Sequence, residues 1–173
     1  MQADTACFTG HRPGKLPWGS DEDSPACRMM KLRLISAAFK ACDDGFCRFI
    51  SGMADGVDLI AAEAVLKLKE ARPGVSLECA LPYPGAGRNS RNRDRYDRVL
   101  AAADRVEVIA QSYSPGCLMR RNRYMVDNSA RVIAVYGGGP GGTRATLDYA
   151  HKLGREVVLI DLRPKGNSEN CGD

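Results

Sequence analysis

The stretch from Val132 to Ala150, VIAVYGGGPGGTRATLDYA, constrains the fold of this chain more than any other. It opens with a short apolar, β-branched run that ends at glycines, which is typical of a buried strand. An unbroken series of glycine and proline follows, from Gly137 to Gly142. From Thr143 onward, apolar residues recur at helical spacing, at Ala145, Leu147, Ala150 and Leu153. The stretch therefore predicts a strand, a glycine loop and a helix in direct succession.

This order of elements suits a phosphate group. Glycines let the backbone turn sharply and approach a ligand closely. The unpaired N–H groups of the first helical turn, together with the helix dipole, favour an anion. Thr143 and Thr146 would add hydroxyl groups to that turn. Many such turns only connect a strand to a helix, and this loop has neither the P-loop pattern nor a GxGxxG after the first strand. The loop alone leaves both interpretations open.

The rest of the chain alternates apolar runs with helical patterns. We expect strands over residues 5–9, 46–50, 75–81, 106–110, 132–136 and 156–161. No hairpin signal separates them, so we predict a Rossmann-like, three-layer α/β fold with a mainly parallel sheet of about six strands. Such sheets bind ligands at the carboxyl ends of strands, where the strand order reverses. The turns at 10–13, 51–58 and 137–142 all follow strands, so they can converge on one crevice.

Length and composition indicate one domain. The chain has 173 residues, of which 44% are hydrophobic, and this suffices for one sizeable core. We expect a single domain over residues 1–162 and a polar C-terminal tail over 163–173. No apolar run approaches the ~20 residues that span a bilayer. The N-terminus also lacks a signal-peptide pattern, so we expect a cytoplasmic protein with no membrane partner.

Cysteine usage and charge narrow the function classes. The chain has seven cysteines and no CxxC pair, which favours reduced, structural thiols over a metal site. We therefore expect no metal and no required cofactor beyond a bound ligand. The net charge of +4 permits an anionic ligand but does not demand nucleic acid.

The segment 85–98, GAGRNSRNRDRYDR, is rich in charge. Arg91, Arg95 and Arg98 recur at helical spacing beside the aromatic Tyr96. Most runs of this kind are solvated helix faces, and a phosphate-binding edge is the alternative. Binding of single-stranded nucleic acid would need a basic groove with several aromatic platforms. We therefore expect a solvated helix near the crevice, and nucleic acid remains a less favoured partner.

Four motifs, taken together, resemble a known family. They are GHRP (10–13), SGMADGVD (51–58), RRNRYMVD (120–127) and AVYGGGPGGT (134–143), in this order. The combination resembles the family typified by bacterial YpsA, from about residue 5 to residue 162. The SGMADGVD turn and the segment 142–146 are also similar to two motifs of the DNA-processing protein A family. Both families belong to the SLOG superfamily, as do the phosphoribohydrolases called Lonely guy.

The resemblance implies a Rossmann-like domain that binds a nucleotide or a nucleotide-derived ligand. It places on the ligand side Gly10, His11, Arg12, Ser51, Gly52, Asp58, Gly138, Gly139, Gly141, Gly142 and Thr143, to which we add Thr146. His11 and Arg12 can meet phosphate, although His11 suits a capped turn equally well. Asp58 suits either the dipole of a following helix or a ribose hydroxyl.

One departure from these relatives bears on catalysis. The resemblance to Lonely guy enzymes would place a catalytic glutamate three residues after Thr143, and this chain has Thr146 there. Asp148 lies about 200° further round a helix, so it should not substitute. The favoured interpretation is a sensor or regulator that binds a nucleotide. The alternatives are N-glycosidic hydrolysis of a nucleoside monophosphate or an NAD-derived molecule, with Asp58 as catalytic carboxylate, and binding of single-stranded DNA. The sequence does not identify the ligand, and it does not decide whether the protein forms a homo-oligomer.

Overall fold

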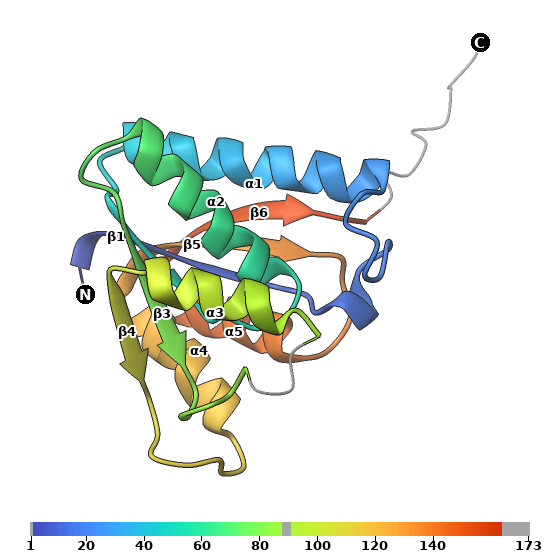
Figure 1. Cartoon of the computed structure of the whole chain (residues 1–173), viewed down its shortest axis with the longest axis vertical. Helices are drawn as coiled ribbons and strands as arrows, with labels where there is room; N and C mark the ends of the chain where they lie inside the picture. The colour runs from blue at the N-terminus through green and yellow to red at the C-terminus, as the bar shows by residue number, and fades with distance from the viewer. Residues whose placement is uncertain (1, 88–90, 164–173) are drawn as a thin grey trace.

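The computed structural model describes residues 2–87 and 91–163 (Figure 1). Within these ranges, six strands form one parallel sheet in the order β4-β3-β2-β1-β5-β6. Their bounds are β1 Gln2–Gly10, β2 Arg48–Ser51, β3 Ser76–Leu81, β4 Arg105–Val108, β5 Ser129–Tyr136 and β6 Glu156–Asp161. The predicted Rossmann-like fold is therefore confirmed.

Helices cover both faces of the sheet, which makes three layers (Figure 1). One face carries α1 (Pro25–Asp43), α2 (Val57–Ala71) and α3 (Arg93–Ala102), and the other carries α4 (Cys117–Asp127) and α5 (Gly142–Lys152). A short 3-10 helix, η1 (Pro13–Lys15), follows β1. No helix in the described ranges is long and apolar enough to cross a membrane.

The core is divided by the sheet because consecutive strand residues point to opposite faces. On the α1 and α2 side, the rings of Phe8 and Phe49 stack with centroids 5.8 Å apart. Their neighbours Cys7 and Ile50 pack on the other side, against Met125 of α4. Both faces of the central strands are thus buried, which explains their continuous apolar runs.

Side-chain contacts fix the start of α1 and the position of α3. Ser24 caps α1, since its Oγ accepts a hydrogen bond from the N–H of Cys27 at 3.2 Å. The expectation of a solvated arginine helix is wrong for Arg95, whose side chain is only 16% exposed. Arg95 donates hydrogen bonds to Glu22 and to Glu63, both at 2.5 Å, and so joins α3 to α2 and to the loop before α1. The expected tail lies outside the described residues from 164 onward.

The strand order reverses next to β1. From β1 the chain moves through β2 and β3 to the edge strand β4, then returns to β5 on the other side of β1. The carboxyl ends of β1 and β5 therefore form the topological switch point, where parallel α/β sheets bind ligands.

Candidate functional site

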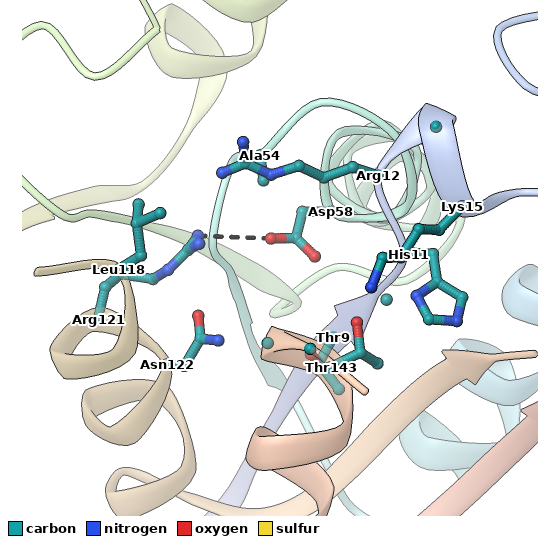
Figure 2. A pocket seen from close by; sticks show the side chains of 14 residues that line it. Thr9, His11, Arg12, Lys15, Ala54, Asp58, Leu118, Arg121, Asn122 and Thr143 are labelled. Carbon is teal, nitrogen blue, oxygen red and sulfur yellow. Dashed lines mark hydrogen bonds and ion pairs between the residues drawn. The ribbon is translucent and has the colours of Figure 1, made fainter. Parts of the chain in front are cut away.

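A cavity of about 270 Å³ lies at this switch point (Figure 2). Four segments that are distant in sequence line it: the end of β1 with η1, the turn before α2, the face of α4, and the start of α5. Seven of the residues expected from sequence line this cavity, namely Gly10, His11, Arg12, Asp58, Gly141, Gly142 and Thr143. The turns after β1, β2 and β5 therefore do converge on one crevice.

The glycine loop between β5 and α5 is held by three hydrogen bonds. Nε2 of His11 accepts from the N–H of Gly137 at 3.1 Å. Nζ of Lys15 donates to the carbonyl of Pro140 at 2.6 Å, and the hydroxyl of Tyr136 donates to the carbonyl of Gly139 at 2.5 Å. The loop is thus tied to η1 and to the end of β1, so the approach to α5 is preorganised.

The N-terminus of α5 faces the cavity without a side-chain cap. Its N-cap is Gly141, and the first N–H that pairs inside the helix is that of Ala145, which donates to Gly141 at 3.0 Å. The preceding N–H groups have no intrahelical partner, by the geometry of any α-helix. A Cβ at Gly142 would meet only Nδ2 of Asn122 at 3.9 Å, which is ordinary contact. The fold therefore does not require glycine at 142, whereas close approach of a ligand would.

A buried ion pair forms the opposite wall of the cavity. Nη1 of Arg121, on α4, lies 3.4 Å from Oδ2 of Asp58, in the first turn of α2, and both side chains are less than 10% exposed (Figure 2). The same guanidinium donates to the carbonyl of Gly52. A Cβ at Gly52 would overlap this guanidinium, so glycine is needed there to admit Arg121. Burial raises the pKa of Asp58, and the attraction of Arg121 opposes that rise.

Positive charge prevails around the cavity. Among the described residues, Arg12, Lys15 and Arg121 line it with one carboxylate, that of Asp58. Burial and the nearby Lys15 lower the pKa of His11 below its ordinary value of 6.5, so at neutral pH its imidazole adds no charge. Three cations against one carboxylate, beside an open helix N-terminus, make an environment that favours an anion.

Comparison with known proteins shows the family of this chain. The sequence model of the YpsA family, described as the YspA SLOG family, matches residues 6–155. The chain belongs to the YpsA family. The SPbeta prophage-derived protein YoqJ of Bacillus subtilis (strain 168) is 32% identical over 136 residues, which cover 70% of this chain and 80% of YoqJ. A UPF0398 protein of Bacillus pumilus (strain SAFR-032) is 29% identical over 172 residues, which cover 94% of this chain and 91% of that protein.

Two solved structures share the fold of this YpsA family member. DNA processing protein A from Helicobacter pylori, described for its single-stranded DNA binding, superposes with a TM-score of 0.62 at 20% identity, over 90% of this chain and 64% of that one. DNA processing protein A from Streptococcus pneumoniae gives a TM-score of 0.61 at 17% identity, over 91% of this chain and 50% of that one. The chain thus spans only part of either protein.

Five of the residues expected on the ligand side lie outside the cavity lining: Ser51, Gly52, Gly138, Gly139 and Thr146. Ser51 is fully buried, where its Oγ donates to the carbonyl of Asp58 at 2.7 Å and accepts from the N–H of Met53 at 3.2 Å. It therefore holds the turn that carries Asp58. Gly138 and Gly139 adopt left-handed backbone, with φ of 97° and 82°, and so shape the loop.

Thr146 connects α5 to α4. Its Oγ1 donates to the carbonyl of Gly142 and accepts from Nδ2 of Asn122, both at 2.8 Å. Thr146 is buried, whereas Asn122 lines the cavity. Asp148 is exposed, pairs with Arg144 at 2.8 Å and does not line the cavity, so it does not take the place of the glutamate.

Sequence reasoning missed the other lining residues, which are Thr9, Gly14, Lys15, Ala54, Leu118, Arg121 and Asn122. A signal for Arg121 was present. Cys117, Arg121 and Met125 are spaced four apart and all lie buried on the inner face of α4. An arginine within an apolar helix stripe must find a buried partner, because an unpaired charge inside a protein is very costly. That reasoning predicts a carboxylate opposite α4, which Asp58 supplies.

Proposed function

We propose that this YpsA family member binds a nucleotide or nucleotide-derived ligand in the switch-point cavity, and that it acts as a sensor or regulator. The observation that carries the proposal is the uncapped N-terminus of α5, which faces a cavity lined by three cationic side chains. Helix N-termini and cations both favour phosphate.

Each part of the ligand has a counterpart in the cavity. The phosphate would lie against the backbone of Gly142 and Thr143, and the side chains of Lys15 and Arg12, which also line the cavity, would pair with its charge (Figure 2). The ribose would face Asp58, since a carboxylate accepts hydrogen bonds from hydroxyl groups. Arg121 orients that carboxylate from behind and balances its charge.

Recovery of a bound ligand tests this proposal. Wild-type protein, purified without added nucleotide, should release a phosphate-bearing, ultraviolet-absorbing molecule that mass spectrometry identifies. Gly142→Val should carry none, because its side chain fills the space beside the helix N-terminus. Gly137→Ala is the matched control, as Gly137 belongs to the same loop but does not line the cavity. A ligand retained equally by all three proteins would place the site elsewhere.

Single-stranded DNA binding is the second candidate, and one surface feature favours it. Tyr83 and Tyr113, in the loops after β3 and β4, meet edge to face with centroids 5.5 Å apart, and Tyr113 is 68% exposed. Tyr96, the aromatic residue noted from sequence, is buried and cannot serve as a platform. Exposed aromatic rings bind unstacked bases. The structural neighbour from Helicobacter pylori is described as binding single-stranded DNA.

Salt dependence separates this candidate from the first. DNA binding would weaken steeply with salt, because phosphate contacts release counterions. It would also weaken in Tyr113→Ala. Binding of a mononucleotide, which engages few phosphate charges, should fall much less steeply with salt. Tyr113→Ala should leave it unchanged, because Tyr113 does not line the switch-point cavity.

A further inference from the structure

A second cavity, of about 520 Å³, adjoins the first, and the two share Arg12 and Gly14 as lining residues. Its walls come from the loop between β1 and α1, the turn before α2, the first half of α2 and the residues just before α3. Its volume falls within the roughly 300–1,000 Å³ that is typical of small-molecule sites. We call it the Trp18 cavity.

The charge of the Trp18 cavity differs from that of its neighbour. Of the described residues, Arg12 and Arg91 line it, and so do Glu22 and Asp55, so among these the two signs are balanced. Glu22 is already engaged, because Arg95 and Lys31 both pair with it, at 2.5 and 2.7 Å. Leu16, Trp18 and Ile60 supply apolar surface. This environment suits an uncharged ring better than a second phosphate.

Trp18 indicates which kind of ligand fits this cavity. Its Nε1 atom is buried and has no hydrogen-bond partner among the described residues. An indole N–H is a donor only, so its missing partner must be an acceptor. Buried polar groups in proteins nearly always have a partner, and an exception calls for an explanation such as a ligand. The indole of Trp18 lines the cavity and offers a stacking surface to a heteroaromatic ring. Its N–H has almost no accessible surface without a ligand, so it bonds a ring nitrogen or carbonyl oxygen of that ring once the indole turns toward the cavity.

The loop that carries Trp18 is held firmly. Glu22 ties it to α3 through Arg95, which in turn bonds Glu63 of α2. A preorganised wall binds a ligand without the entropic cost of ordering a loop.

We propose that the Trp18 cavity receives the nucleobase of the ligand whose phosphate lies at the N-terminus of α5. This inference rests on the proposed function and deepens it, because it assigns the base to a site and makes Trp18 the residue that recognises it. The ligand crosses between the cavities beside Arg12 and Gly14, which both cavities share.

The fluorescence of Trp18 gives a direct test, because it is the only tryptophan of the chain. Wild-type protein is titrated with ribose 5-phosphate and with AMP, GMP, CMP and UMP, each followed by fluorescence and by calorimetry. We expect ribose 5-phosphate to bind without changing the emission. At least one mononucleotide should bind about tenfold more tightly and quench it. Trp18→Phe should lose most of that tenfold gain, yet bind ribose 5-phosphate as wild type does.

Tyr113→Ala is the control for the exposed aromatic pair of Tyr83 and Tyr113, and thermal unfolding of each variant confirms its fold. If ribose 5-phosphate binds but no base adds affinity or changes the emission, the base subsite is wrong and the phosphate site stands. If Tyr113→Ala, rather than Trp18→Phe, loses the gain, the base lies on the Tyr83 and Tyr113 side, which also overturns the inference. If neither ribose 5-phosphate nor any mononucleotide binds, the proposed function itself fails and the subsite with it.

Discussion

His11 and Gly137, 126 positions apart in sequence, are joined by a hydrogen bond of 3.1 Å in which the imidazole Nε2 accepts from the backbone N–H. This bond fastens the start of the glycine loop to the end of β1. It requires Nε2 to be unprotonated, so a neutral His11 carries its proton on Nδ1. The ring that lines the cavity therefore also holds the loop in place.

This bond predicts a pH dependence of stability. The pKa of His11 is lowered from 6.5, so the unfolded chain binds a proton more readily than the folded one. The contribution is fully present above about pH 6.5 and is lost as pH falls through the lowered pKa, with a slope of at most about 1.4 kcal/mol per pH unit. His11→Gln keeps an acceptor but does not titrate. Between about pH 7 and pH 5.5, urea unfolding should show a smaller loss of unfolding free energy in this variant than in wild type. An equal loss in both would contradict the assignment.

The ion pair between Arg121 and Asp58 predicts strong coupling. Arg121→Met leaves the Asp58 carboxylate buried without a counter-charge and should cost about 3 kcal/mol of unfolding free energy at neutral pH. In that variant the carboxyl pKa lies even further above its unfolded value, so stability should recover as pH falls toward about 4. Adding Asp58→Asn should restore part of the loss at neutral pH. Additive effects in the double variant, measured by urea unfolding, would show that the two residues do not interact.

Arg95 and Arg98 lie on the same helix, α3, but differ in their contacts, so substitutions at the two positions can be compared. Arg95 bonds Glu22 and Glu63, whereas Arg98 is exposed. Arg95→Glu should lower the unfolding free energy by about 2 kcal/mol, because it sets three carboxylates against one another in a partly buried place. Arg98→Glu should change it by less than about 0.5 kcal/mol. Equal midpoints of thermal unfolding for the two variants would argue against the bridge.

A further prediction concerns catalysis. We expect wild-type protein to release little free adenine from AMP. The structure puts Thr146 in a buried contact with Asn122, and no carboxylate from α5 lines the cavity. General acid–base help from a carboxylate is worth roughly 10²–10⁴ in rate. Chromatography after long incubation measures the release. Robust release that Asp58→Asn abolishes would instead support the hydrolase alternative, with Asp58 as the catalytic group.

The sequence predicted the scaffold better than the site. Alternating apolar runs and glycine turns suffice to predict a parallel sheet, because burial of both strand faces leaves a clear pattern in residues such as Val132 and Ile133. Side chains that enter the cavity from unrelated elements leave no such pattern. Lys15 and Asn122 reach the site only because η1 and α4 pack beside the glycine loop. Arg95 looked solvated because its partners, Glu22 and Glu63, are distant in sequence.

Calorimetric titration of wild type, Gly142→Val and Gly137→Ala with AMP and with ribose 5-phosphate tests whether the N-terminus of α5 binds phosphate. We predict that wild type and Gly137→Ala bind at least one of these ligands at a one-to-one ratio. We also predict that Gly142→Val binds neither while keeping its thermal unfolding midpoint, since a Cβ at 142 meets only Nδ2 of Asn122, at an ordinary contact distance of 3.9 Å. Undiminished binding by a folded Gly142→Val, or no binding by wild type, would contradict a phosphate site at the N-terminus of α5.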